Sequence, residues 1–361
     1  MPSRLLQLLI LLTLRTAPLP AAEIALRPGM PHPFAWEGDW QPLHLSISYF
    51  SLTPSPEGLS LWIDAHFQGF DSIIRLDGPA LPRLNRPPPQ LDARLIRYQG
   101  PPLDGLPAPI LSRSAATRLR DGTLLIYTSV GPRYTGGGSE LAPTLLRQRP
   151  GEAWEDLGPP AGDPAATIAT VREHDATLRC EGAGIVELPD GRLRLYAHGL
   201  VDAAEVPQRL RNNRLAVNTL LIAEADTPEG PWHWRRRPDG TPIDLFANSP
   251  LPWLFAHIQP LGEHGWMLTG GSAWPPQQLY AAYSRDGLHF HLPADDDGRP
   301  LPLHRAADTQ PPARFAKALR GLIAPGNRFH AVLSQSLPEH NGRSWLYHRT
   351  ATFLPPAWPE D

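Results

Sequence analysis

A hairpin pattern returns five times along the chain, and this repeat constrains the fold more than any other sequence feature. Each copy has an apolar strand, a tight turn that contains glycine, and a second strand with alternating apolar residues, which is typical of antiparallel pairs. The turn glycines are Gly58, Gly122, Gly191, Gly265 and Gly326, so successive turns are 64, 69, 74 and 61 residues apart. A spacing this regular indicates a repeated structural unit.

A second hairpin lies between successive copies of the first. The segments "TLLRQRPGEAWEDL" (144–157), "TLLIAEADTPEGPWHW" (219–234) and "LYAAYSRDGLHFH" (279–291) follow this plan. Two hairpins per repeat make a four-stranded sheet, and five such sheets in sequence order predict an all-β protein, a five-bladed β-propeller with four-stranded antiparallel blades. A β-sandwich is the competing architecture, but it does not explain the regular alternation of the two hairpins. We expect the ring to close by pairing of the segment near "HPFAWEGDW" with the strand near "SWLYHRTATF".

The first 22 residues have the order of a secretory signal peptide. Arg4 is followed by an apolar stretch from Leu5 to Leu14 and then by small residues. The stretch is shorter than the roughly 20 apolar residues of a spanning helix. We therefore expect cleavage near Ala21 or Ala22, no membrane segment in the mature form, a periplasmic or secreted protein, and one propeller domain over residues 32–361.

Charge and cysteine content exclude some classes of protein. The net charge of -3 gives no broad basic field for a nucleic acid. Cys180 is the single cysteine of the sequence, so an internal disulfide and a cysteine-based zinc site are both impossible. An exported chain without disulfides has to depend on its apolar core, which a chain of 361 residues can build.

Long connections gather on one predicted face of the ring. In a propeller blade, the turns within each hairpin lie on one face, and the connections between hairpins and between blades lie on the other. Here the hairpin turns are short, whereas the other connections include the long segments 129–143, 198–216 and 270–278. Long irregular loops on one face usually carry function. Glu181 opens the innermost strand of blade three, so we expect it on this face beside the ring axis.

The blade pattern resembles that of the five-bladed propeller glycosidases, glycoside hydrolase family 43 and related families. The resemblance is carried by "EGAGIVELPDGRLRLYAHG" as blade three, "ADTPEGPWHW" as its outer hairpin, and "YSRDGLHF" as the outer hairpin of blade four. It implies a general acid at the start of the innermost strand of blade three, a position that Glu181 matches. Enclosure between apolar strands would raise the pKa of such a glutamate. The alternative for Glu181 is a structural carboxylate paired with Arg179 or a neighbouring blade.

The resemblance also implies two aspartates, and here the sequence departs from the family. Asp39 precedes "PLHLSISYF" and is the candidate for the base of blade one, although its alignment is loose. In blade two the corresponding place holds Ser112, Arg113 and Ser114, with no carboxylate. The other acidic candidates for the second carboxylate are Asp64, Asp71, Asp202 and Glu205, and the sequence does not choose among them.

Cations stand at the equivalent starts of other innermost strands. Arg113 in blade two is a candidate ligand for an anionic group such as a uronate or sulfate, because guanidinium geometry suits such anions. For Lys317 and Arg320 in blade five, the sequence favours side chains that extend to the rim. His257 in blade four is a substrate-binding candidate, although a lone histidine on an apolar strand is more often a hydrogen-bonded core residue. We expect Arg113, Glu181 and His257 to converge at the mouth of the channel.

Aromatic residues near the same face are candidate sugar platforms. Tyr134, Trp253 and Trp274 lie in or beside the long connections, and we take Tyr134 and Trp274 as substrate-binding candidates. The resemblance implies that some of these propellers hold calcium or a water cluster near a channel histidine. One histidine does not make a metal site, so we expect no metal and no cofactor.

Two functions fit these features. The first is an exported glycosidase that acts on an oligosaccharide or polysaccharide, including one with an anionic group, with Glu181 as general acid and Asp39 as second carboxylate. The second is a non-catalytic propeller that binds carbohydrate or a protein at the same funnel. The missing carboxylate of blade two favours the second function, whereas the position of Glu181 and the long loops favour the first. We expect a monomer.

Overall fold

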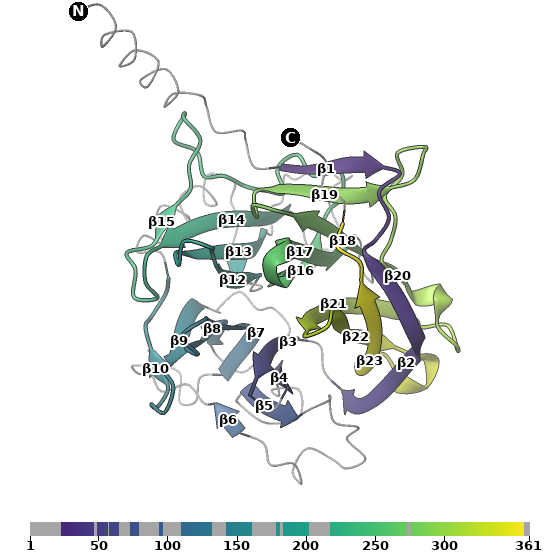
Figure 1. The fold of residues 1–361 in the computed structure, drawn as a ribbon, viewed down its shortest axis with the longest axis horizontal. Coiled ribbons are helices and arrows are strands. Elements are labelled where there is room, and N and C mark those ends of the chain that lie inside the picture. Colours follow the sequence, from purple (N-terminus) through teal and green to yellow (C-terminus); the bar gives the residue numbers. More distant parts are fainter. Residues whose placement is uncertain are drawn as a thin grey trace, which may run out of the picture.

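The computed structural model describes most of the chain. The described residues are 23–46, 49–56, 58–64, 73–78, 94–96, 110–131, 142–160, 178–180, 183–201, 217–272 and 276–356. Figure 1 looks through the ring: five sheets radiate from a common centre, and β3, β7, β12, β16 and β21 are the innermost strands. The prediction of an all-β, five-bladed propeller is confirmed.

Blades one and two are regular four-stranded antiparallel sheets in sequence order. Blade one has the order β3-β4-β5-β6 and blade two the order β7-β8-β9-β10. The strands are β3 (Phe50–Ser55), β4 (Gly58–Asp64), β5 (Ile73–Gly78), β6 (Arg94–Ile96), β7 (Ile110–Arg118), β8 (Leu124–Gly131), β9 (Ala142–Gln148) and β10 (Glu155–Asp156).

Blades three and four carry additions to the basic plan. The innermost strand of blade three is divided into β11 and β12, which both pair with β13. Blade four gains β20 and a parallel outer strand, β1. The strands are β11 (Leu178–Cys180), β12 (Gly184–Glu187), β13 (Leu193–Val201), β14 (Val217–Ala225), β15 (His233–Trp234), β16 (Leu254–Pro260), β17 (Trp266–Gly271), β18 (Gln278–Ser284), β19 (His289–Ala294), β20 (His304–Arg305) and β1 (Glu23–Pro28).

Blade five is completed by the N-terminal part of the chain. Its order is β2-β23-β22-β21, from β21 (Phe315–Ala324), β22 (Arg328–Ser336) and β23 (Trp345–Phe353) with β2 (Phe34–Ser46) as the outermost strand. The pairing of β2 with β23 is antiparallel and sets Phe34 opposite Phe353. This confirms the predicted closure of the ring (Figure 1).

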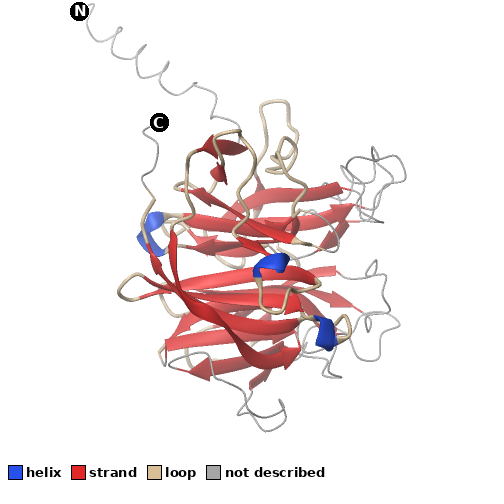
Figure 2. Cartoon of the chain, turned by 90° about the vertical axis from the view of Figure 1, so that its right-hand side faces the viewer, coloured by secondary structure: helices blue, strands red, loops and turns tan. Residues whose placement is uncertain are grey.

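Neighbouring blades are joined by contacts between their innermost strands. β3 contacts β7, β7 contacts β12, β12 contacts β16, β16 contacts β21, and β21 contacts β3. Figure 2 shows the sheets from the side, with short 3-10 helices at Gly262–His264, Ala306–Asp308 and Pro338–His340 in the connections. Within the described ranges no helix has the length and apolar character needed to cross a bilayer.

Each of the five blade interfaces holds its own apolar cluster. Blades one and two meet around Trp62 and Ile126, and blades two and three around Leu125 and Leu195. The other three interfaces are centred on Tyr196 with Trp266, Phe34 with Phe329, and Leu61 with Val332. The hydrophobic effect therefore acts between sheets all around the ring rather than at one central core.

The closing strand β2 contributes to two of these clusters. Phe34 packs between blades four and five, where its ring stacks on Phe329 with centroids 4.2 Å apart. Leu43 and Leu45, further along the same strand, pack between blades five and one. β2 therefore fixes blade five against both of its neighbours.

Two boundaries differ from the sequence expectation. The ring includes β1, which begins at Glu23, whereas the domain was expected to start at residue 32. The segment "PLHLSISYF" does not open blade one, because Leu45 belongs to the outer strand of blade five and the inner hairpin of blade one begins at Phe50. Both differences arise because β1 and β2 are recruited by blades that come late in the sequence.

We predict that Phe34→Ala destabilises the protein by about 3–5 kcal/mol, because it removes a buried aromatic ring from the interface that closes the ring. The free energy of unfolding in denaturant measures this effect. Leu354→Ala is the control, because Leu354 is next to the same strand pair but 52% exposed. An equal effect of the two substitutions would contradict the role assigned to Phe34.

We also predict that acid destabilises the fold through buried histidines. His32 connects β1 to β2, and its ring bonds the Tyr283 hydroxyl at 2.9 Å and the Leu301 carbonyl at 3.1 Å. Burial lowers the pKa of His32 to about 4, so the unfolded chain takes up the proton first as pH falls. Stability is then lost from about pH 6.5 down to about pH 4, at up to about 1.4 kcal/mol per pH unit for this group.

Denaturant unfolding at pH 7, 6 and 5 tests this prediction. His32→Gln should flatten the pH dependence, whereas His233→Gln at an exposed position should not. Wild type and His32→Gln with equal slopes would contradict it.

Candidate functional site

The innermost strands are irregular at their N-terminal ends, at the face where the long connections were predicted. β7 has a register shift between Ser112 and Ala115, β16 between Leu254 and His257, and β21 between Ala316 and Ala318. In blade three the corresponding irregularity is the division between β11 and β12. Bulges redirect side chains and are frequent next to functional sites. We call this end of the channel the near face.

A buried carboxylate lies at the near face between blades one and two. Asp64 ends β4 and is only 2% exposed. The Ser114 hydroxyl, from the innermost strand of blade two, donates to its Oδ1 at 2.8 Å and lies 3.0 Å from the Thr128 hydroxyl. A carboxylate from blade one thus reaches the strand start of blade two, where the sequence has Ser112, Arg113 and Ser114 but no acidic residue.

Lys317 lies at the near face of blade five, between two aromatic rings. Its Nζ is 4.7 Å from the ring centroid of Tyr49 and 4.8 Å from that of Phe255. The two rings meet edge to face, and Lys317 is buried. A cation over desolvated aromatic faces is stabilised by their quadrupoles.

Tyr49 connects the cation to the carboxylate. Its ring faces Lys317, while its backbone carbonyl accepts a 3.1 Å hydrogen bond from the Asp64 amide. Phe255 is equally constrained, because it lies within the register shift of β16 and has a φ of 53°. An aromatic residue in the left-handed region is uncommon, and such residues gather at functional sites.

A second cation, Arg320, lies deeper in the channel on β21. Its guanidinium donates to the Phe255 carbonyl at 3.2 Å and to the Thr269 hydroxyl and the Leu319 carbonyl at 3.3 Å each. Burial lowers the pKa of Arg320 to about 9, although the nearby Tyr49 opposes this shift. Arg320 remains charged at neutral pH, so the channel contains a fixed positive charge.

His257 is buried in the same region on β16. Burial, with a smaller contribution from the charge of Arg320, holds the pKa of His257 well below its usual range. The imidazole is therefore neutral at physiological pH. The nearby charge of Arg320 disfavours a metal cation at this imidazole. Among the described residues there is also no group of three His, Cys, Asp or Glu that could hold a metal ion.

Several of the predicted site residues cannot be compared with the geometry. Glu181, Tyr134 and Trp274 lie outside the described residues, as do Asp71, Asp202 and Glu205. Arg113 is on β7 within the irregular stretch, but its side chain is also outside the description. The convergence of Arg113, Glu181 and His257 therefore stays a prediction. Two residues after Glu181, the backbone carbonyl of Ala183 accepts a 2.8 Å hydrogen bond from the Ile258 amide of blade four.

The position expected for Asp39 is wrong. Asp39 is exposed on β2, the outermost strand of blade five, and does not precede the innermost strand of blade one. The physical reason is the ring closure, which takes residues 34–46 away from blade one and pairs them with β23. Of the other acidic candidates, Asp64 lies within the described residues and is buried at the near face.

The aromatic and cationic candidates also need correction. Lys317 and Arg320 do not extend to the rim, because both are buried against the channel wall. Trp253 is fully buried and stacks on Phe246, so it is a core residue and not a sugar platform. Sequence reasoning missed Tyr49 and Phe255. For Phe255 the available signal was its position two residues before the candidate His257.

Comparisons with known proteins bear on the fold. No family model matches the chain, and no curated protein matches it in sequence. An exo-1,5-alpha-L-arabinanase from a bovine ruminal metagenomic library is similar in structure, with a TM-score of 0.50, 12% identity, and coverage of 86% of this chain and 95% of that one. The chain has the fold of the five-bladed propeller glycosidases.

Two further solved structures have lower TM-scores. A protein of unknown function from Dyadobacter fermentans has a TM-score of 0.48 at 12% identity, over 93% of this chain and 85% of that one. The GH43_1 enzyme from Xanthomonas citri, in complex with xylotriose, has a TM-score of 0.39 at 16% identity, over 65% and 72%.

We predict that Asp64 and Ser114 are energetically coupled. A hydrogen bond to a buried charged group is worth about 1.5–3 kcal/mol, so a double-mutant cycle with Asp64→Asn and Ser114→Ala should give a coupling energy of that size. Unfolding free energies of the four proteins measure it. Additive effects of the two substitutions would show that the contact does not hold the carboxylate.

Proposed function

We propose that the protein is a glycoside hydrolase that acts on a glycan at the near-face mouth of the channel. The observation that carries this proposal is the Asp64 carboxylate, which Ser114 holds at the start of the innermost strand of blade two. It supplies an acidic group where the family pattern requires one and the local sequence lacks it. The fold supports the same function, because the structurally similar protein with a TM-score of 0.50 is described as an arabinanase.

In this proposal Glu181 is the general acid and Asp64 is the second carboxylate. Glycosidic cleavage needs a protonated carboxyl near the leaving oxygen, and an ionised carboxylate that activates water, attacks the sugar or supports the acid. In sequence Glu181 falls between β11 and β12, the two parts of the innermost strand of blade three, and Asp64 is bonded to the innermost strand of blade two. Two buried cations of blade five, Lys317 and Arg320, add positive charge to this end of the channel.

The same cations favour a glycan with an acidic group. Lys317 and Arg320 are both buried at the channel, and a carboxylate or sulfate on the sugar would be attracted by their field. Tyr49 and Phe255 hold Lys317 in place, so the direction of this attraction is fixed before the ligand binds. The protein would act as a monomer, because every element of this site comes from one ring.

A non-catalytic propeller that binds carbohydrate or protein at the same mouth is the second candidate. It is favoured by the absence of an acidic residue in blade two itself, where Ser112 to Ser114 occupy the expected place. The two candidates make opposite predictions for turnover and the same prediction for binding.

Export is part of the proposal. The apolar stretch Leu5 to Leu14 behind Arg4 fits a signal peptide. Cleavage after Ala22 would leave β1, which begins at Glu23, complete for its pairing with β19. N-terminal sequencing of the mature protein tests the position of the cut.

We predict that Glu181→Gln and Asp64→Asn each reduce glycan hydrolysis by about 10²–10⁴-fold while glycan binding is kept, because each replacement preserves shape but removes the ionisable carboxyl. Purified mature protein is assayed against neutral and uronate-containing oligosaccharides, with reducing ends and binding followed in parallel. Glu263→Gln and Asp297→Asn are the matched controls, since both carboxylates are exposed and neither belongs to the candidate site.

Binding without any turnover in the wild type would support the non-catalytic candidate instead. Turnover that survives Glu181→Gln on unactivated substrates would place the acid elsewhere. Turnover that survives Asp64→Asn would remove Asp64 from the mechanism.

A further inference from the structure

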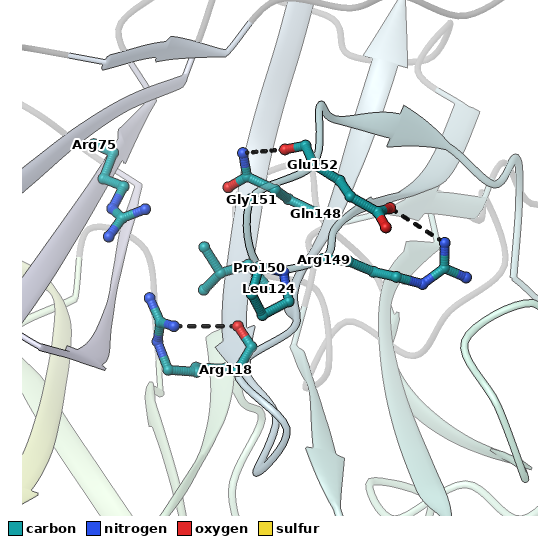
Figure 3. A pocket seen from close by; sticks show the side chains of 9 residues that line it. Arg75, Arg118, Leu124, Gln148, Arg149, Pro150, Gly151 and Glu152 are labelled. Carbon is teal, nitrogen blue, oxygen red and sulfur yellow. Dashed lines mark hydrogen bonds and ion pairs between the residues drawn. The ribbon is translucent and has the colours of Figure 1, made fainter.

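A hollow of about 370 Å³ lies between blades one and two, on the face opposite the candidate site. It is bounded by the hairpin turns of blade two and by β5 of blade one, and the near-face residues Asp64 and Ser114 take no part in it. Its lining is dominated by charged and polar groups, including three arginines: Arg75, Arg118 and Arg149 (Figure 3). A hollow of this volume is at the lower end of the range for small-molecule sites.

Arg75 enters the hollow from β5 and is held rigidly. Its Nε donates to Asp77 at 2.8 Å, and its guanidinium lies 5.1 Å from the centroid of the Trp62 ring. Asp77 also accepts from the Ser60 hydroxyl. The side chain is buried, so the aromatic contact and the ion pair fix its direction. Among the described residues the hydrogen bond of this guanidinium is made through Nε, and Nη1 and Nη2 make none.

Arg118 enters the hollow from the far end of β7. Its Nε donates to the Pro54 carbonyl at 2.8 Å and its Nη1 to the Gly122 carbonyl at 3.1 Å. Nη2 has no partner among the described residues. Figure 3 shows the guanidinium groups of Arg75 and Arg118 directed toward the same space beside Pro150.

Arg149 lines the hollow but is directed away from this space. Its guanidinium is paired with Glu152 at 3.4 Å and with Glu229 at 3.2 Å, on the side remote from Arg75 (Figure 3). Asp77 compensates one of the two charges that do face the space. One guanidinium charge therefore remains uncompensated.

The two facing cations disfavour each other. Burial lowers the pKa of Arg118, and the charge of Arg75 lowers it further, with Asp77 opposing these effects. An anion that enters between the two guanidinium groups would relieve this repulsion.

The walls of the hollow are fixed by tight turns. The β7–β8 turn is closed by a hydrogen bond from the Gly122 amide to the Leu119 carbonyl and by the Asp121 carboxylate, which accepts from the Thr123 amide. The β9–β10 turn is closed by the Glu152 amide on the Arg149 carbonyl. The donors are therefore held in position before any ligand binds.

We propose that this hollow is an oxyanion-binding site for the carboxylate, sulfate or phosphate group of a small ligand, held by Arg75 and Arg118. Guanidinium groups bind such oxyanions through paired N–H donors. The three nitrogens without partners, Nη1 and Nη2 of Arg75 and Nη2 of Arg118, supply donors from two directions. The site does not depend on the proposed hydrolase activity, since it shares no residue with the near face.

Calorimetric titration of the wild-type protein with inorganic phosphate, sulfate, D-glucuronate and D-glucose at low ionic strength tests the proposal. We expect binding of at least one of the anions and none of glucose, and the three anions separate the phosphate, sulfate and carboxylate forms of the ligand. Arg118→Gln should weaken anion binding by about tenfold or more, because it removes a charged donor. Arg149→Gln is the matched control, since it removes the same charge from the same hollow but from a group that points away.

The remaining outcomes overturn the proposal. The absence of binding for every anion would overturn it. Equal losses of anion affinity in Arg118→Gln and Arg149→Gln would also overturn it, because they would indicate general electrostatic attraction rather than a specific site. Anion binding that is lost in Lys317→Met and kept in Arg118→Gln would assign the anion to the near face. Circular dichroism of each variant confirms that the ring is intact.

Discussion

The pairing of β2 with β23 is the constraint on which the rest of the structure depends. A row of sheets with apolar faces on both sides has two open ends, and only closure into a ring covers both. Residues 34–46 supply the outer strand of the last blade, whose first part packs toward blade four and whose later part packs toward blade one. The five interface clusters can then all be filled at once, without a disulfide.

Closure also determines what the channel can contain. The five innermost strands converge, so polar side chains near the axis have to find partners on neighbouring blades rather than in solvent. Arg320 is paired with carbonyl and hydroxyl groups of blade four, and Asp64 with a hydroxyl of blade two. Buried charges are costly unless they are bonded in this way. This end of the channel therefore combines a buried carboxylate, two buried cations and a buried neutral histidine.

The blade pattern of the sequence was sufficient to predict the fold because each blade is local. Each hairpin is specified by its glycine turn, its alternating apolar residues and its length, which all lie within about 20 positions of the sequence. The structure confirms the five blades predicted from these hairpins. The sequence also predicted that the segment near "HPFAWEGDW" closes the ring, and the pairing of β2 with β23 confirms this. It failed for Asp39, where a strand that looks like the start of blade one is used by blade five.

The sequence by itself determined the number of blades and the antiparallel order of the strands within each blade. Only the tertiary structure decided which charges meet. Asp64 and Ser114 are 50 positions apart, and Lys317 is more than 250 positions from Tyr49. No local pattern encodes such distances, because they follow from the angle between blades and from the register of each innermost strand. The same holds for Arg75 and Arg118, which face one hollow because two blades bring their edges together.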